Sequence, residues 1–149
     1  MATLQTEETR KVAALLGGRK VFHRSFSDAG EMLDLVRKGL PYAALEALVR
    51  VLSVRAAEVT RLLGVAPRTL ARRKVARRLA PAESDRLYRV AYVTLLAADI
   101  LGSVDKAKGW LTQPNRALGD APPLSLLDTE IGERQVEEVL ERINHGIFS

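Results

Sequence analysis

The chain has 149 residues, of which 47% are hydrophobic and 28% are charged, a composition typical of a globular protein. It contains no cysteine and only two histidines, which excludes a disulfide framework, cysteine-based zinc sites and a thiol nucleophile. The longest uncharged stretch, Val90 to Ala98, is far shorter than the roughly 18 to 20 residues that cross a bilayer. The N-terminus also lacks the basic start and apolar middle of a secretory signal. We therefore expect a cytoplasmic protein with no metal, no cofactor and no membrane association.

Charge is distributed unevenly along the chain. The net charge is +5, but residues 1–49 carry +1, residues 50–98 carry +8 and residues 99–149 carry −4. A basic centre favours partners that bear phosphates, and an acidic end favours a basic or neutral partner. The pattern predicts two surfaces with different partners, although a basic block of this size can also be a solvated face without one.

Glycines and prolines separate helical patterns along the chain, and no segment shows the sustained alternation of a half-buried strand. The sequence therefore predicts an all-α fold. Residues 1–20 end in a Gly-Gly pair and have weak periodicity, so we expect a mobile arm or a short, loosely packed helix. Ser27 is the expected N-cap of a helix that ends at Gly39, and Pro41 starts the next helix.

Two short helices and a long one are expected in the basic centre. The short helices span 56–63 and 67–74, and Gly64 allows a tight turn between them. Pro81 opens a long helix that ends at Leu101. Its middle is apolar almost all round, so it is the central helix of the domain, part of a subunit interface, or both. The candidate dimerisation residues on this helix are Tyr88, Tyr92 and Leu95.

The two short helices have the pattern of a helix-turn-helix motif, whose second helix enters the DNA major groove. Arginine suits this task because its guanidinium can bind O6 and N7 of guanine together, and because phosphate contacts supply much of the affinity. The expected DNA-binding residues are Arg68, Thr69 and Arg72 at base edges and Arg73, Lys74, Arg77 and Arg78 at phosphates. Two alternatives stay open: a solvated basic helix, or a module that binds an acidic protein surface and never touches DNA.

The acidic C-terminal region is expected to contain a helix over 104–111, a loop rich in turn formers and a last helix that ends before Gly146. The apolar pair Ile147 and Phe148 follows, and either folds back onto the core or enters a cleft of a partner. No combination of nucleophile, base and orienting acid is recognisable, so we do not expect an enzyme.

Short motifs in this region resemble those of a known family. They are W-L at 110–111, P-N-x-x-L-G at 114–119, P-L-x-L-L at 123–127, T-x-x-G at 129–132 and R-I-x-H-G at 142–146. Together with LLGVAPRTLARR at 62–73, they make residues 40–148 resemble the Xre/MbcA/ParS-type antitoxins of RES-domain toxin–antitoxin pairs. The sequence departs from the family at Ala66-Pro67, where a polar pair is usual, and at Leu101, where an aromatic residue is expected.

The resemblance implies an Xre-like helix-turn-helix domain over 21–102 that binds operator DNA and represses its own operon. It also implies a C-terminal domain over 103–149 that covers the active site of a RES toxin, so that NAD is the substrate of the toxin and not a ligand of this chain. The expected toxin-binding residues are Trp110, Asn115, Leu127, Thr129, Arg142, His145, Ile147 and Phe148. Because operators usually have two half-sites, we expect a homodimer within a larger toxin–antitoxin assembly. The alternative is a stand-alone transcriptional regulator without a toxin partner.

Overall fold

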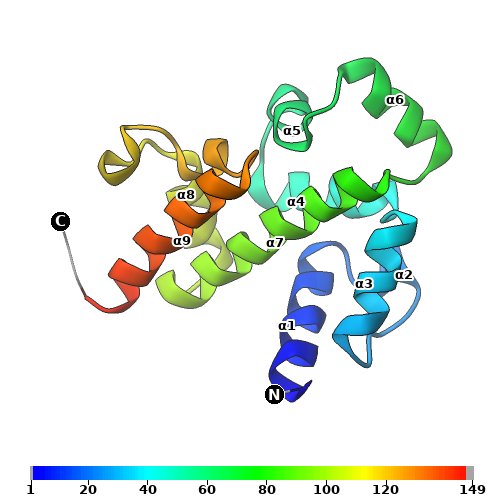
Figure 1. The fold of residues 1–149 in the computed structure, drawn as a ribbon, viewed down its shortest axis with the longest axis horizontal. Coiled ribbons are helices and arrows are strands. Elements are labelled where there is room, and N and C mark those ends of the chain that lie inside the picture. The colour runs from blue at the N-terminus through cyan, green and yellow to red at the C-terminus, as the bar shows by residue number, and fades with distance from the viewer. Residues whose placement is uncertain (1, 147–149) are drawn as a thin grey trace. The chain divides into compact units, whose positions relative to one another are not determined.

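The computed structural model describes residues 2–146, which fold into helices joined by short turns (Figure 1). This confirms the predicted all-α fold, since residues 2–146 contain no strand beyond two isolated bridges. The helices are α1 (Ala2–Leu15), α2 (Arg19–Phe22), α3 (Ala29–Lys38), α4 (Tyr42–Leu52), α5 (Ala56–Leu63), α6 (Pro67–Ala76), α7 (Pro81–Leu101), α8 (Val104–Thr112), the 3-10 helices η1 (Arg116–Leu118) and η2 (Pro123–Leu126), and α9 (Glu130–Asn144).

Residue contacts divide the chain into two compact units, and the division falls inside α7. Unit 1 extends to Ala91 and unit 2 begins at Tyr92. The sequence places the boundary later, after residue 102, because Gly102 ends the helix. The contacts group the second half of α7 with the residues that follow it, and the domain boundary after residue 102 stays a prediction.

The N-terminal segment is a packed part of unit 1, which differs from the expected mobile arm. Helix α1 contacts α3 and α4, and the side chains of Val12 and Leu16 are completely buried. Thr9 is only 1% exposed and extends the same buried stripe at helical spacing. Because a threonine occupies a core position of this stripe, the apolar periodicity of the segment is weak in the sequence.

Helix α3 begins one residue later than the sequence analysis expected. Its N-cap is Asp28 and not Ser27: the Asp28 side chain accepts a hydrogen bond of 3.0 Å from the Glu31 N–H, and Glu31 accepts from the Asp28 N–H at 3.2 Å. This reciprocal pair is a capping box. The Ser27 N–H also donates to the Glu31 carboxylate, and this bond lowers the Glu31 pKa below its ordinary value. Gly39 ends α3 as expected.

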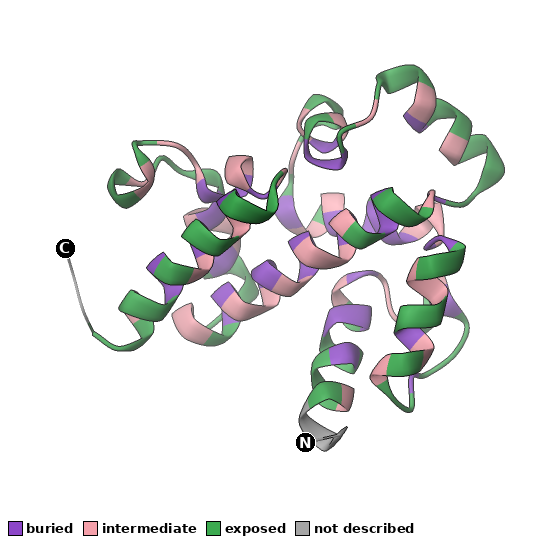
Figure 2. Cartoon of the chain, viewed as in Figure 1, coloured by how far each residue is buried: buried purple, intermediate pink, exposed green. Residues whose placement is uncertain are grey.

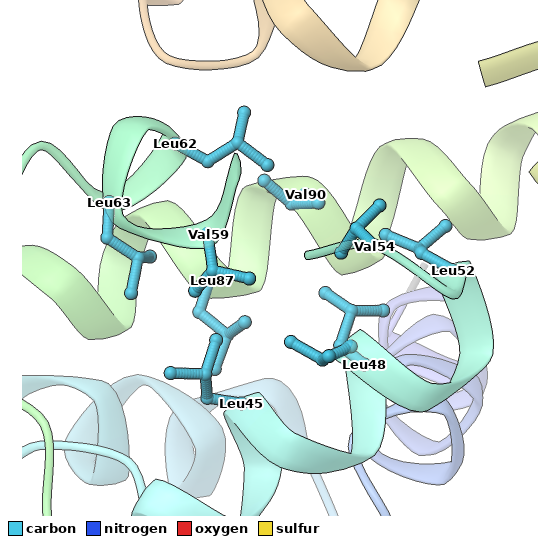
Figure 3. Close-up of a pocket in the computed structure, with 10 residues that line it drawn as sticks. Leu45, Leu48, Leu52, Val54, Val59, Leu62, Leu63, Leu87 and Val90 are labelled. Carbon is cyan, nitrogen blue, oxygen red and sulfur yellow. The ribbon is translucent and has the colours of Figure 1, made fainter. Parts of the chain in front are cut away.

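Helices α4, α5 and α7 enclose the core of unit 1. Figure 3 shows their side chains around a small cavity of about 20 Å³. Leu45 and Leu48 come from α4, Val59 and Leu63 from α5, and Leu87 from α7. This partly open pocket has room for about one water molecule, and its lining is apolar.

Unit 2 packs α8 and α9 against η2. The core positions include Ala107 and Leu111 of α8, Leu124 of η2, and Val136 and Leu140 of α9. The last helix is therefore amphipathic, with Val136, Val139 and Leu140 buried on one face.

The apolar middle of α7 is buried or half-buried in the single chain along its whole length (Figure 2). A helix that is apolar on nearly every side must be buried on every side if it is the central helix of the domain, and this burial agrees with that interpretation. Within residues 2–146, no single helix is long and apolar enough to cross a membrane, although α7 and α8, bent by 113° at their junction, pass the same test as a pair.

Candidate functional site

The turn between α5 and α6 has the geometry of a helix-turn-helix. Val59, Leu63 and Leu70 are buried between its helices and the rest of unit 1, and Val65 is half-buried. Gly64 ends α5 in the left-handed conformation with φ of 67°, which favours glycine. The Val65 N–H donates to the Thr60 carbonyl at 3.1 Å and closes the turn.

Arg86 of α7 holds this turn, and sequence reasoning missed it. Its Nη1 donates to the Leu63 carbonyl at 2.6 Å, which satisfies one of the free carbonyls at the end of α5. A Cβ on Gly64 would lie 2.0 Å from the same nitrogen, so a larger residue there would displace the Arg86 guanidinium from this contact. No local pattern marks Arg86, because the contact joins residues 23 positions apart.

Helix α6 is exposed over most of its surface (Figure 2). Leu70 is its buried residue, while Arg68, Arg72 and Lys74 are exposed and Thr69 is half-buried. The Arg72 Nη2 lies 3.4 Å from the Thr69 hydroxyl oxygen, so these two candidate base-contacting side chains lie side by side. The helix has Pro67 in its first turn and no side-chain cap, as the Ala66-Pro67 departure from the family pattern indicates.

Arg73 differs from Arg68, Arg72 and Lys74 of the same helix because it forms an ion pair with a residue of α7. Its Nε donates to both oxygens of Glu83, at 2.9 and 3.3 Å, and Glu83 Oε1 also accepts from the Ala80 N–H at 2.9 Å. Burial alone raises the pKa of Glu83, but these hydrogen bonds and the charges of Arg73 and Arg86 lower it below its ordinary value. The hydrogen bond to Glu83 likewise raises the pKa of Arg73.

Arg77 and Arg78 lie just beyond the end of α6, and both are exposed. Arg77 caps the helix with φ of 61°, a left-handed conformation unusual for a residue other than glycine. Its carbonyl accepts from the Tyr42 N–H at 3.1 Å, and Arg78 forms a bridge with Pro41. The end of α6 is thus fixed to the start of α4.

In unit 2, Asn115 organises the loop that contains η1. Its Oδ1 accepts from the Ala117 N–H at 2.9 Å, and its carbonyl accepts from Leu118 at 3.0 Å and Asp120 at 2.9 Å. Its own N–H donates to the Ala121 carbonyl at 3.1 Å. The P-N-x-x-L-G motif therefore has a structural role in shaping this loop.

The T-x-x-G motif also has a structural role. Thr129 caps α9 by accepting a hydrogen bond of 3.0 Å from the Gly132 N–H. A Cβ on Gly132 would lie 1.9 Å from the Leu126 carbonyl oxygen. Gly132 therefore lets α9 approach η2 closely.

The other candidate toxin-binding residues differ in exposure. Leu127 is buried and Trp110 is half-buried, so both contribute to the core, while Arg142 and His145 are exposed near the end of α9. Ile147 and Phe148 lie outside the described residues. Sequence reasoning missed Ile131, whose side chain is 75% exposed in the first turn of α9.

The candidate dimerisation residues Tyr88, Tyr92 and Leu95 are half-buried within one chain. Tyr88 packs inside unit 1, where burial raises the pKa of its hydroxyl group and a hydrogen bond with Thr9 of α1 opposes that rise. Among residues 2–146, no group of three His, Asp or Glu side chains is arranged to hold a metal ion.

Comparison with known proteins matches both units to families. Residues 31–92 match the antitoxin Xre-like helix-turn-helix domain, and residues 96–146 match the antitoxin Xre/MbcA/ParS C-terminal toxin-binding domain. The chain is 34% identical to antitoxin Xre of Yersinia enterocolitica over 79% of this chain and 81% of that protein. It is 32% identical to antitoxin Xre of Photorhabdus laumondii over 83% and 85% of the two chains. The chain therefore belongs to the Xre/MbcA/ParS antitoxin family.

A solved structure supports the same assignment. The chain is similar to a chain of the crystal structure of the M. tuberculosis MbcT–MbcA toxin–antitoxin complex, with a TM-score of 0.52 and 25% identity, covering 72% of this chain and 96% of that one. The protein is an antitoxin of an Xre-type toxin–antitoxin system with a helix-turn-helix domain, and the resemblance drawn from its motifs is confirmed.

Proposed function

We propose that this antitoxin neutralises a RES-domain toxin by covering its active site, and that it binds operator DNA to repress its own operon. NAD is then consumed by the toxin and is not a ligand of the antitoxin. The likeness to a chain of the MbcT–MbcA complex and the match to a toxin-binding domain support the toxin partner.

The exposed basic surface of α6 carries the DNA-binding part of the proposal. The first two turns of α6 carry Arg68, Thr69 and Arg72. Recognition helices contact base edges with residues in this part of the helix. Lys74, Arg77 and Arg78 extend this surface and are suited to phosphates. Because Arg73 is bound to Glu83, we assign it the task of fixing α6 on unit 1, with its remaining guanidinium nitrogens available to a phosphate.

The exposed face of α9 supports the toxin-binding part of the proposal. Ile131, Arg142 and His145 are exposed there, and His145 Nε2 lies 3.5 Å from Glu141 Oε2. An exposed apolar side chain among charged ones can serve as an anchor when a partner removes it from water. Ile147 and Phe148 follow this face in the sequence and remain candidates for the same interface.

A homodimer completes the proposal, because an operator with two half-sites requires two copies of α6. We assign its contacts to the half-buried residues Tyr92 and Leu95 of α7. Leu95→Glu tests this assignment. The variant should be a folded monomer by analytical ultracentrifugation and circular dichroism, whereas an unfolded chain would show that Leu95 belongs to the core alone.

Co-expression with the product of the adjacent gene tests the neutralisation. Growth and cellular NAD are measured with the full chain and with a truncation that lacks residues 135–149. The proposal predicts that the full chain restores both and that the truncation restores neither. If neither chain rescues growth and no stable complex is recovered, the chain acts as a stand-alone regulator.

A further inference from the structure

A hollow lined by basic side chains lies where α2 meets the C-terminal end of α6. Lys20 and His23 border it from the α2 side, and Lys74 and Arg77 border it from the α6 side. Its volume is about 390 Å³, room for roughly a dozen water molecules at about 30 Å³ each. It is therefore a hydrated surface feature and not a gap in the core.

Backbone hydrogen bonds fix the α6 side of this hollow. The Tyr42 N–H donates to the Arg77 carbonyl at 3.1 Å, and the Leu79 N–H donates to the Leu40 carbonyl at 2.9 Å. Tyr42 itself lines the hollow. The position of Arg77 beside α2 thus follows from the fold of unit 1, because these two bonds fix the backbone just after the end of α6, and Lys74 lies in the last turn of the same helix.

The basic side chains of the hollow make no polar contact with the residues that the structure describes. Lys20, His23, Lys74 and Arg77 are exposed, and none of their side chains has a hydrogen bond or ion pair with any residue from 2 to 146. Arg24, the next basic residue of the same segment, is by contrast paired with Glu31.

Charge in the hollow favours an anion. Glu46 is the acidic residue of the lining, and the positive side chains of Lys20, Lys74 and Arg77 outnumber it. An excess of exposed positive charge beside a candidate recognition helix suits contacts with the DNA backbone, and such contacts fix a protein's register on the duplex.

We propose that Lys20 and His23 bind backbone phosphates of duplex DNA next to those bound by Lys74 and Arg77. The inference rests on the proposed DNA binding by α6 and extends it to a second element. Helix α2 precedes residues 31–92, which match the Xre-like helix-turn-helix family. The N-terminal segment therefore adds a phosphate-binding surface to the family's domain.

Fluorescence anisotropy of the full chain with labelled duplexes tests the proposal. The probes are the promoter region of the chain's own operon and a scrambled duplex of equal length, each at salt concentrations from 50 to 200 mM. Loss of one phosphate contact lowers the slope of log affinity against log salt by about 0.9, which is about 3.5-fold over this range. For Lys20→Gln we expect this smaller slope and similar losses of affinity for both probes, since phosphates carry no sequence information.

Lys11→Gln is the matched control, because it removes the same charge from α1. Lys11 lies 4.0 Å from Glu7, and α1 is separated from α6 in Figure 1. The control should keep the wild-type slope, and circular dichroism should show both variants folded. An equal change of slope in both variants would overturn the proposal, since it would show only the effect of net charge.

Failure of this inference can be distinguished from failure of the proposed function. If Lys20→Gln keeps the wild-type slope while Arg72→Ala loses its preference for the promoter duplex, α6 binds DNA and α2 does not. If the wild-type chain binds neither duplex, the proposed DNA binding itself is wrong.

Discussion

Arg73 Nε lies 2.9 Å from Glu83 Oε1, and this ion pair joins the candidate recognition helix to the first turn of α7. The burial of Leu70 also holds α6 on unit 1, and the backbone hydrogen bond between Arg77 and Tyr42 fixes the end of the helix. These contacts leave most of the surface of α6 exposed. The pair joins the two helices through one charge-assisted donor, because the Arg73 Nε–H is shared between both carboxylate oxygens.

Glu83→Gln should lower the free energy of unfolding at neutral pH. The pKa of Glu83 is lowered in the folded protein, so its ionised form stabilises the fold above the ordinary glutamate pKa of about 4.3. This contribution is lost as pH falls through the lower pKa of the folded state. Urea unfolding of the wild type and of Glu83→Gln is measured between pH 7 and pH 3. The difference in their free energies of unfolding should be constant down to about pH 5 and smaller below. A difference that does not depend on pH would show that the Glu83 charge is not responsible.

Arg72→Ala should reduce the preference for operator over scrambled DNA, because we assign Arg72 to a base edge. One bidentate contact with a base contributes about 1 to 3 kcal/mol of discrimination. Arg78→Ala is the matched control, since loss of a phosphate contact should weaken binding to both duplexes alike. Equal losses for both duplexes with Arg72→Ala would place Arg72 at the backbone instead.

Gly132→Ala should destabilise unit 2, although alanine favours helices. The added Cβ would lie 1.9 Å from the Leu126 carbonyl oxygen, and overpacking of this kind costs about 1 to 3 kcal/mol. Gly109→Ala is the control within α8, where a Cβ would meet nothing within 4 Å. That variant should gain up to about 1 kcal/mol from helix propensity. The midpoint temperatures of thermal unfolding should therefore shift in opposite directions for the two variants. Equal shifts would disprove the close contact.

Ile131→Asp should weaken toxin binding by about tenfold or more, which corresponds to about 1.4 kcal/mol. Folding should be unaffected, because the side chain is 75% exposed and an acidic residue is favourable in the first turn of a helix. Leu33→Asp is the control, because it makes the same kind of change on α3, at a side chain that is 48% exposed. Calorimetric titration of the toxin should show weaker binding for the first variant only. Unchanged binding of Ile131→Asp would remove this residue from the interface.

Leu87→Ala should lower the free energy of unfolding by about 2 to 5 kcal/mol. Leu87 is 2% exposed and already borders the small cavity, so the truncation enlarges an existing void (Figure 3). Leu33→Ala, at a half-exposed position, should change stability by no more than about 0.5 kcal/mol. Denaturant titration distinguishes the two, and a loss below about 1 kcal/mol for Leu87→Ala would show that the site collapses around the deletion.

The fold was largely predictable where proline, glycine and apolar spacing mark the helices. The bounds of α5 and α7 agree with the prediction, because Gly64 and Pro81 set the local backbone conformation where α5 ends and where α7 begins. Helix α1 was expected as an arm because Thr9 interrupts its apolar stripe.

The candidate site was predictable in composition but not in contacts. The basic residues of α6 are evident from the sequence, whereas the ion pair of Arg73 and the hydrogen bond from Arg86 to Leu63 depend on how α7 packs. Asn115 and Thr129, two of the predicted toxin-binding residues, make hydrogen bonds that also give them structural roles. Gly132 of the T-x-x-G motif has a structural role through its close approach to Leu126.

The most direct test of the account is the rate at which the purified toxin of the same operon consumes NAD as this chain is added. The account predicts that inhibition rises with the concentration of the full chain, becomes complete at a fixed ratio of the two proteins, and is lost when residues 135–149 are removed. An undiminished rate of NAD consumption in the presence of excess full-length chain would contradict neutralisation by direct binding.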